Sequence, residues 1–276
     1  MDKYLTTGMH RQYKDSKNLE SRINLHKLYS INKTGWAKWV FEQYRFDQNS
    51  KILELGCGNG YIWDENRNRI PESISIILSD FSEGMVESAK KRIGTTNSQF
   101  KFKVIDAQSV PYSENVFDIV IANHVLGNVL DINKALSEIS RVLKPNGRLY
   151  STTIGNNHMK EIDNYLLRVD KRILFTDKTL EGRFLLDNGS EKLKRYFSNI
   201  EIRRYEDALQ IDNINDLIDY ILSSTGISNV NEYLIGDKLN EFKNILENEC
   251  GIKGYIHISK ESGMFIGKNG KGSITN

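Results

Sequence analysis

A glycine-rich loop is the segment of this 276-residue chain whose residue types and spacing best suit chemistry. It reads Glu54-Leu55-Gly56-Cys57-Gly58-Asn59-Gly60 and directly follows the apolar run KIL. Glycines at alternate positions let the backbone turn sharply and let a ligand approach bare amide groups. The G-x-G-x-G spacing differs from the dinucleotide fingerprint G-x-G-x-x-G, and the Lys-Ser/Thr of a P-loop is missing. The loop predicts a ligand site, with a glycine-rich turn that binds nothing as the alternative.

Two acids follow the loop at places where they can serve the same ligand. Asp80 ends the next apolar run, 20 residues after Gly60, where a carboxylate can accept hydrogen bonds from both hydroxyls of a ribose. Asp106 ends the third apolar run. Ligands of open α/β sheets bind outside the carboxyl ends of the strands. The two acids and the loop therefore suit a ligand with a diol and an amine-bearing base, although Asp80 could instead cap the helix that follows.

Alternating strands and helices must position these residues. The pattern predicts strands at 51–58, 73–80, 100–106, 116–123 and 148–155, and helices at 82–94 and 132–147, the latter stopped by Pro145 and Gly147. Such alternation is typical of a doubly wound α/β fold with a mostly parallel sheet and helices on both faces.

The remaining chain adds to this sheet at both ends. Residues 1–50 read as amphipathic helix, broken near Ser30–Asn32. Late helices are predicted at 159–174, 190–197, 215–224 and 236–250, and late strand signals at 200–211 and 254–268, the second either a hairpin or one bulged strand. Two late strands bring the sheet to seven. We expect a helical lid at 1–45 and one domain at 46–276, with acceptor-side helical additions at 156–250.

Composition and charge narrow the class of protein. The formal net charge is +2, from 38 Lys and Arg against 36 Asp and Glu, so a nucleic-acid-binding scaffold is not predicted. Basic clusters at 90–92, 192–195 and 203–204 alternate with acids and read as solvated surface. Two cysteines indicate a reducing compartment, and no apolar run reaches membrane-spanning length or resembles a secretory signal. We expect a cytoplasmic protein without membrane partner; no metal site is predicted, since no cluster has metal-ligand spacing.

Four segments, LELGCGNG, LSDFSEGM, VIDAQSVPYSENVFDIVIANHVL and ALSEISRVLKPNGRLY, resemble the successive motifs of class I S-adenosylmethionine-dependent methyltransferases. The ubiquinone/menaquinone-biosynthesis-like, small-molecule branch is the most similar. The motifs lie in order over residues 51–155. The resemblance implies a Rossmann-like fold and S-adenosyl-L-methionine as cofactor, with S-adenosyl-L-homocysteine as product.

The resemblance also implies a role for each matched position. Glu54 would hold the methionine amino group, Asp80 the ribose hydroxyls and Asp106 the adenine amine. Asn123 and His124 would lie under the methyl-bearing sulfur. The other implied cofactor-binding residues are Gly56, Cys57, Gly58, Gly60, Phe81, Ser82, Met85, Ala107 and Gln108.

Residues on the acceptor side are predicted from their place in the chain. His124 is the candidate catalytic residue, because it ends the fourth strand; a His bonded to nearby backbone is the alternative. Leu126-Gly127-Asn128 stands where family members commonly carry a large aromatic residue and a His. Tyr13, Tyr29, His158 and Asp163 are candidate substrate contacts, although helix capping and helix-dipole effects also explain polar residues at the last two positions.

The leading function is methyl transfer to O, N or C of a small metabolite or natural product by in-line displacement. The alternatives are a peptide or protein methyltransferase, a non-catalytic regulator that binds S-adenosylmethionine, and a nicotinamide oxidoreductase, which the loop spacing disfavours. Neither the acceptor nor the oligomeric state follows from the residues.

Overall fold

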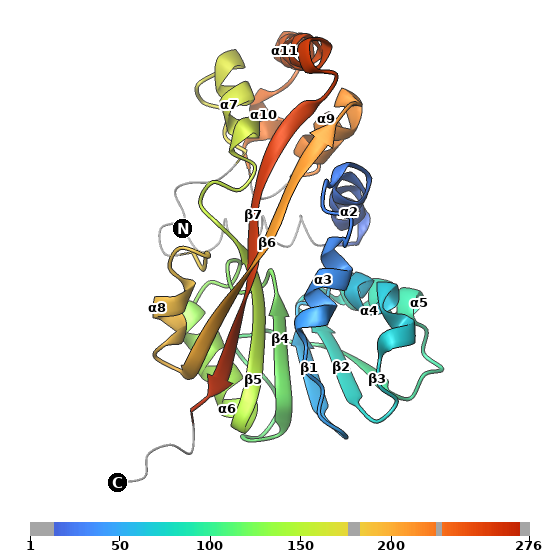
Figure 1. Cartoon of the computed structure of the whole chain (residues 1–276), viewed down its shortest axis with the longest axis vertical. Coiled ribbons are helices and arrows are strands. Elements are labelled where there is room, and N and C mark those ends of the chain that lie inside the picture. Colours follow the sequence, from blue (N-terminus) through green and yellow to red (C-terminus); the bar gives the residue numbers. More distant parts are fainter. Residues whose placement is uncertain (1–13, 176–182, 225–227, 271–276) are drawn as a thin grey trace. The chain divides into compact units, whose positions relative to one another are not determined.

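The computed structural model describes residues 14–175, 183–224 and 228–270. Its helices and strands alternate along the chain as the sequence pattern predicts (Figure 1). The helices are α2 (Lys17–Tyr29), α3 (Trp36–Gln43), α4 (Tyr61–Glu65), the 3-10 helix η1 (Arg67–Arg69), α5 (Glu83–Ile93), α6 (Ile132–Val142), α7 (Lys160–Val169), α8 (Gly189–Leu193), α9 (Ile214–Leu222), α10 (Val230–Tyr233) and α11 (Asp237–Lys253). The strands are β1 (Lys51–Leu55), β2 (Ser75–Asp80), β3 (Phe100–Val104), β4 (Phe117–Asn123), β5 (Leu143–Ile154), β6 (Phe197–Ile211) and β7 (Ile256–Asn269).

The strands form one seven-stranded sheet in the order β3-β2-β1-β4-β5-β7-β6. Strands β1 to β5 pair in parallel, and β7 pairs antiparallel with β5. The predicted doubly wound, mostly parallel sheet of seven strands is confirmed. The segment 254–268, predicted as a hairpin or one bulged strand, forms a single strand, β7.

The described residues fall into two compact units. The sheet unit comprises residues 36–156, 183–205 and 262–270, and the helical unit comprises 14–35, 157–175, 206–224 and 228–261. Strands β6 and β7 contribute residues to both. The predicted boundary between a lid at 1–45 and a domain at 46–276 remains a prediction, which a variant lacking residues 1–20 tests by its cofactor affinity.

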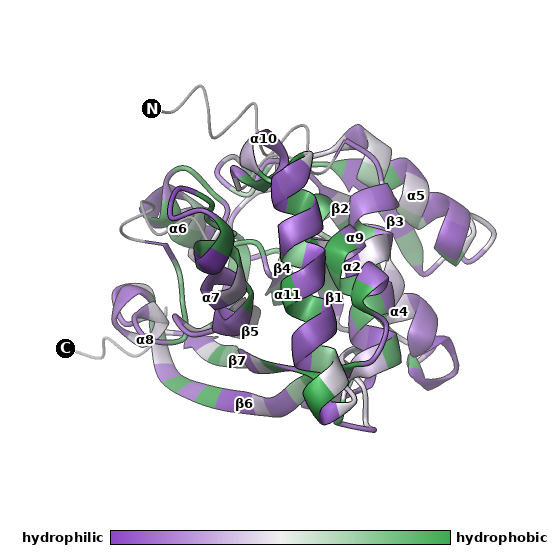
Figure 2. Ribbon diagram, turned by 90° about the horizontal axis from the view of Figure 1, so that it is seen from above, coloured by the Kyte–Doolittle hydropathy of each residue, from purple (hydrophilic) through white to green (hydrophobic). Residues whose placement is uncertain are grey.

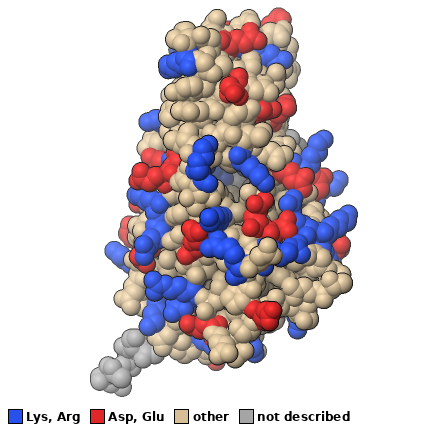
Figure 3. Space-filling view, turned by 45° about the vertical axis from the view of Figure 1, so that its right-hand side comes forward, with Lys and Arg blue, Asp and Glu red and all other residues tan. Residues whose placement is uncertain are grey.

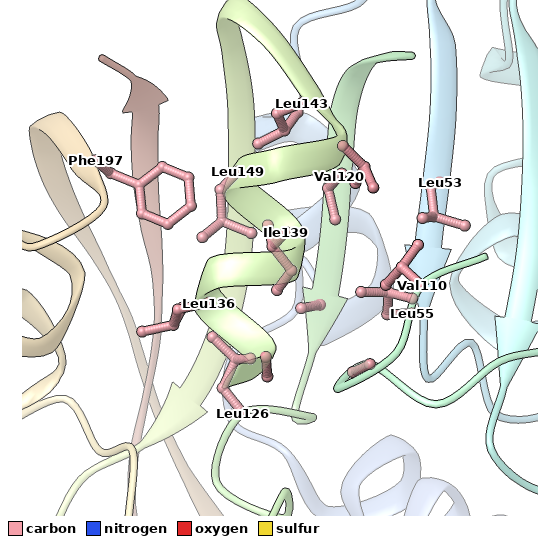
Figure 4. Packing of buried hydrophobic residues seen from close by; sticks show 14 of the residues in the cluster. Leu53, Leu55, Val110, Val120, Leu126, Leu136, Ile139, Leu143, Leu149 and Phe197 are labelled. Atoms are coloured by element: carbon pink, nitrogen blue, oxygen red, sulfur yellow. The ribbon is translucent and has the colours of Figure 1, made fainter. Parts of the chain in front are cut away.

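Both faces of the sheet unit are covered by apolar side chains, as expected for parallel strands between helices. Neighbouring residues of one strand point to opposite faces of the sheet. Leu53 belongs to the buried cluster that includes residues of α6, whereas Ile52 belongs to the buried cluster that includes residues of α3 and α4. Figure 4 shows Leu136 and Ile139 of α6 in the same buried cluster as Val120 and Leu149 of the sheet. This packing fixes the carboxyl ends of β1, β2 and β4, where the candidate residues lie.

The predicted boundary between α6 and β5 was wrong, and the helices predicted at 159–174 and 190–197 end early, at Val169 and Leu193. The helix expected at 132–147 ends at Val142, and β5 begins at Leu143 and passes through Pro145 and Gly147. Asn146 has a φ of 64°, and the pairing with β4 shifts register between Phe117 and Ile119. Proline and glycine are tolerated here because the strand is irregular at this end.

The helical unit has its own core of buried side chains from α2, α7, α9 and α11 and from the ends of β6 and β7. Leu217 and Ile218 of α9 and Phe242 and Leu246 of α11 are among them. Figure 2 shows hydrophobic and hydrophilic residues alternating along α11, as expected for a helix with one buried face. The break predicted near Ser30–Asn32 is confirmed, since α2 ends at Tyr29 and α3 begins at Trp36.

A buried ion pair joins β6 and β7 within the helical unit. The Asp207 and Lys260 side chains are 0% and 5% exposed, and burial lowers the pKa of the lysine. The Asp207 carboxylate also accepts hydrogen bonds from Ser30 Oγ at 2.7 Å and from the Asn32 backbone N at 3.0 Å. This carboxylate therefore ties the segment that follows α2 to β6.

Replacing Asp207 with Asn is expected to lower the free energy of unfolding by about 2 kcal/mol, because Lys260 loses its buried counter-charge. This loss is smaller than the cost of leaving a buried charge unpaired, because Lys260 can give up its proton and become neutral. Denaturant unfolding at neutral pH measures it. The matched control is Glu249→Gln, which breaks the more exposed pair with Lys253 and should cost less than about 1 kcal/mol. Equal losses in the two variants would contradict the argument.

Candidate functional site

The glycine loop turns back against the end of β2. Gly56, Gly58 and Gly60 have φ values of 69°, 53° and 76°, a region that side chains strongly disfavour. The backbone N of Cys57 donates to the Ser79 carbonyl at 2.8 Å. A Cβ on Gly56 would lie 2.2 Å from a Val125 methyl group. The loop thus needs glycine for its conformation and, at Gly56, for space as well.

Asp80 holds this loop closed. Its carboxylate oxygens accept hydrogen bonds from the backbone N of Gly58 at 3.0 Å and from that of Ser82 at 2.9 Å. Burial raises the pKa of Asp80, and these backbone hydrogen bonds oppose the rise. Each carboxylate oxygen can accept a second hydrogen bond. Asp80 therefore retains acceptor capacity for a ligand diol while it shapes the loop.

Glu54, the last residue but one of β1, is 2% exposed. Its carboxylate accepts from Trp63 Nε1 at 2.5 Å and from Asn123 Nδ2 at 3.0 Å, and the same Nδ2 donates to Tyr44 Oη at 2.8 Å. Burial raises the pKa of Glu54 to about 7, although the hydrogen bonds from Trp63 and Asn123 partly oppose this rise. No ion pair among the described residues includes Glu54. A buried carboxyl group thus stands without a counter-charge from the part of the chain described.

Two amide atoms near the loop are buried without a hydrogen-bond partner in the described structure. They are Asn59 Nδ2, a donor, and Asn123 Oδ1, an acceptor. Buried polar atoms are nearly always paired, so each unpaired one requires an explanation. Together with the Glu54 carboxyl, they fit a bound ligand that carries a positive charge, an acceptor and a donor.

The predicted adenine-side residues differ in exposure. Phe81 is 49% exposed, whereas Met85 of α5 is 1% exposed. Ser82 caps α5, its Oγ accepting from the Met85 backbone N at 3.3 Å. A contact of these residues with a ligand stays a prediction.

Asp106 and Gln108 form a turn beyond β3. Asp106 Oδ1 accepts from the backbone N of Gln108 at 2.8 Å and from its Nε2 at 3.1 Å. Gln108 Oε1 accepts from the Asp131 backbone N at 2.8 Å. Ala107 between them is buried. The turn is therefore built before any ligand contacts it, and the predicted adenine contacts remain untested.

His124 follows β4 directly and is exposed. Its φ is 53°, and its backbone N donates to the Thr152 carbonyl at 3.0 Å and to Thr152 Oγ1 at 3.1 Å. The ring lies 5.3 Å from that of Trp36, centroid to centroid. His124 is next to Asn123, so the candidate base and the Glu54 network share one strand end.

The predicted acceptor-side residues belong to the helical unit, and each described one is engaged there. The Tyr29 hydroxyl donates to Asp216 of α9, and burial raises its pKa to about 12. His158 Nδ1 lies 2.9 Å from the Glu261 carbonyl oxygen. Asp163 is buried and accepts from the Phe175 backbone N at 2.8 Å. Tyr13 lies outside the described residues.

A further prediction concerns the thiol of Cys57. Burial and the nearby Glu54 and Asp80 carboxyls raise the pKa of the Cys57 thiol well above its usual value, which suits packing rather than nucleophilic attack.

Within the described residues, no group of three or more His, Cys, Asp or Glu side chains is arranged to hold a metal ion. Figure 3 shows acidic and basic side chains intermingled on the face drawn. In the basic cluster 90–92, Lys90 pairs with Glu87 and Arg92 with Asp64.

Tyr44 and Trp63 were missed as site residues. Both are buried. Trp63 of α4 donates to the Glu54 carboxyl, and Tyr44, which follows α3, accepts from the Asn123 amide that also donates to Glu54. In the sequence they read as apolar core residues. The one available signal was that a buried indole N–H or phenol O–H needs a polar partner.

Comparison with known proteins assigns this site to a class. Residues 53–151 match the model of the methyltransferase domain family. The demethylmenaquinone methyltransferase of Lactobacillus johnsonii is 33% identical over 144 residues, which are 49% of this chain and 59% of that protein. The ubiquinone/menaquinone biosynthesis C-methyltransferase UbiE of Rickettsia prowazekii is 41% identical over 131 residues, 46% of this chain and 50% of that protein.

Solved structures of low sequence identity share the fold. The YcgJ protein of Bacillus subtilis has a TM-score of 0.57 at 16% identity, over 84% of this chain and 97% of its own. A second structure is that of phosphoethanolamine N-methyltransferase 2 of Haemonchus contortus, solved with phosphomonomethylethanolamine and S-adenosylhomocysteine. Its TM-score is 0.57 at 17% identity, over 95% of this chain and 59% of that chain.

Residues 53–151 therefore form a class I S-adenosyl-L-methionine-dependent methyltransferase domain, and S-adenosyl-L-methionine is the cofactor of that class. The domain is similar in sequence to the ubiquinone/menaquinone-biosynthesis branch. The chain spans about half of the length of these curated relatives. Among the described residues, no helix combines the length and apolar character needed to cross a membrane.

Proposed function

We propose that this protein transfers a methyl group from S-adenosyl-L-methionine to a small acceptor, and that the first acceptor to test is a ring carbon of a quinol. The observation that carries the proposal is the buried Glu54 carboxyl without a counter-charge among the described residues. A cofactor with an ammonium and a sulfonium group supplies that charge. The names of the curated relatives, which include a demethylmenaquinone methyltransferase, support the choice of acceptor.

The chain's own residues would do three things for this reaction. Glu54 would hold the cationic end of the cofactor, Asp80 its ribose and Asp106 its adenine, each at the carboxyl end of a parallel strand. The bound cofactor supplies an electrophilic methyl group on a neutral leaving group. Orientation of an acceptor in line with that bond accounts for roughly 7–11 kcal/mol of such a barrier.

A proton must also leave the acceptor when a quinol is methylated. His124 is the titratable side chain that follows β4 and is exposed. It would take the hydroxyl proton of the quinol, so that the ring carbon attacks the methyl group with greater electron density while the S–CH3 bond breaks. The proton on the methylated ring carbon would then move to the oxygen, which restores the aromatic quinol. General-base help of this kind contributes about 10²–10⁴-fold. The two cysteines of the chain favour the cytoplasm as its compartment.

Label transfer tests the proposal. The purified protein is incubated with methyl-labelled S-adenosylmethionine and reduced demethylmenaquinone, and the labelled product is separated by chromatography. We expect label in the quinol, with the new methyl group on a ring carbon. A parallel incubation with cell extract covers other acceptors: label in protein or nucleic acid would overturn the small-molecule assignment. Binding of S-adenosylhomocysteine without transfer to any acceptor would indicate a regulator.

A further inference from the structure

Three aromatic side chains of the sheet unit pack together, and one of them contacts the candidate base. Trp36 and Trp39 come from α3, Tyr205 comes from β6, and His124 follows β4. The Trp36 ring lies 5.3 Å from the His124 ring at an interplanar angle of 35°. Trp36 is itself held between Trp39, stacked at 5.4 Å, and Tyr205, edge-on at 5.2 Å. Trp39 and Tyr205 are 5.1 Å apart, so the three rings support one another.

The backbone of His124 is fixed independently of its ring. Thr152 accepts both hydrogen bonds of the backbone N described above, and the His124 carbonyl accepts from Asn128 Nδ2 at 2.9 Å. A φ of 53° is rare for a residue with a side chain, because it strains the backbone. Such strain persists where the surroundings enforce it, and often at functional sites. With the backbone fixed, the ring's direction depends on what it packs against, which includes Trp36.

The aromatic residues and His124 differ in how far they are buried. Tyr205 is 2% exposed and belongs to the interior, whereas Trp36 and Trp39 are half-buried and His124 is exposed. An imidazole on an indole face at the surface gains little from burial. It gains more when it carries a charge, since an indole ring attracts a cation. The contact therefore favours the protonated ring, the form that His124 takes after accepting a proton.

We propose that Trp36 is the positioning residue of His124: its indole holds the imidazole at the carboxyl end of β4 and stabilises the imidazolium formed when His124 takes a proton from the acceptor. This role rests on the proposed function, in which His124 is the candidate base. Trp36 contacts the base and not the reacting atoms, so its effect passes through His124. Trp39 supports Trp36 but has no ring contact with His124 among the described residues.

Tryptophan fluorescence tests the contact without any acceptor. A protonated imidazole quenches an indole that it touches, so the emission of the parent chain should fall as the pH drops through the range around 6.5 where histidine titrates. We expect His124→Gln and Trp36→Phe to lose this response and Trp39→Phe to keep it. Persistence of the response in His124→Gln, or its loss in Trp39→Phe alone, would show that Trp36 and His124 are not in contact.

Kinetics of label transfer to the quinol test the positioning role. We expect Trp36→Leu to lower kcat about tenfold with less than a twofold change in acceptor KM, and Trp36→Phe, which keeps a ring face, to recover part of the loss. The acid limb of the pH profile should shift in Trp36→Leu and stay in place in Trp39→Leu. Equal kcat values and profiles in these two leucine variants would overturn the role.

Failure of the proposed function gives a different pattern. If the parent chain binds S-adenosylhomocysteine but labels no quinol, the acceptor assignment is wrong. The fluorescence response then decides on its own whether Trp36 holds His124.

Discussion

A Glu54→Gln variant is expected to bind S-adenosylhomocysteine about 100-fold more weakly than the parent chain at pH 8, because the bound ammonium group loses a buried, charge-assisted hydrogen bond. Isothermal titration calorimetry measures this loss. In the parent chain, binding should also strengthen as the pH rises. The pKa of Glu54 is raised to about 7 in the unliganded protein, so below pH 7 a proton must leave before the carboxylate can pair with the cation. Affinity should rise up to about tenfold per pH unit below 7 and level off above it.

The same variant should be more stable without ligand. A carboxyl group whose folded pKa is raised binds more protons in the folded than in the unfolded state, so the protein loses stability as the pH rises from about 4.5 through 7. At about 1.4 kcal/mol per pH unit, the full penalty at pH 8 is about 3 kcal/mol. The neutral amide of Glu54→Gln avoids this penalty, and the Asn123 amide can turn so that its unpartnered Oδ1 accepts from the introduced amide.

Unfolding in denaturant at pH 4.5 and at pH 8 separates the two contributions. We expect Glu54→Gln to gain stability at pH 8 and to gain none at pH 4.5. Glu72→Gln makes the same change of charge at an exposed position before β2 and should leave both affinity and stability unchanged. If Glu54→Gln bound the ligand as tightly as Glu72→Gln does, Glu54 would not be the counter-charge of the cofactor.

A Gly56→Ala variant is expected to lose about 2–5 kcal/mol of folding free energy, the second large effect. An alanine at a φ of 69° costs about 1–2 kcal/mol in backbone strain. Its Cβ would lie 2.2 Å from a methyl group of Val125, which must move away and disturb the start of the segment after β4. Overpacking of this kind costs about 1–3 kcal/mol. Thermal unfolding measures the sum, and cofactor affinity should fall with it.

Two further variants separate strain from overlap. Gly35 has a φ of 76°, and a Cβ there meets no atom within 4 Å, so Gly35→Ala should show the strain alone. Gly56→Ala combined with Val125→Ala removes the overlap and should return to about the level of Gly35→Ala. If Gly56→Ala alone were no worse than Gly35→Ala, close packing at Gly56 would not explain its need for glycine.

Local pattern was sufficient to predict the parallel core and the end of the sheet at which the candidate residues lie. Strands such as β1 and β4 are short apolar runs followed by polar residues, and this signal does not depend on the rest of the fold. Ser82 at the start of α5 and Gly94 at its end are likewise local signals, and both boundaries agree with the structure. The end of α6 was mispredicted because proline and glycine usually stop a helix, and here they fall inside an irregular strand.

The partners of the site residues could not be predicted in the same way. Glu54 was expected to face a ligand, and the structure adds that Trp63 and Asn123 both donate to it. Asp80 was expected to accept from a diol, and the structure adds its hydrogen bond from Gly58. These are contacts between elements far apart in sequence, and neither periodicity nor residue type specifies which side chains meet.

The strand order has a consequence for how the chain is made. Strand β7, the last of the seven in the sequence, lies between β5 and β6, and its pairing joins Arg148 to Lys268. During synthesis, β6 therefore emerges before the strand that connects it to the sheet, and β5 presents an open edge until β7 arrives. Unpaired edges are templates for aggregation, and such distant pairings form slowly. Termination of translation before residue 256 would thus leave two open edges, so chaperone dependence should be concentrated in the interval between the synthesis of β5 and that of β7.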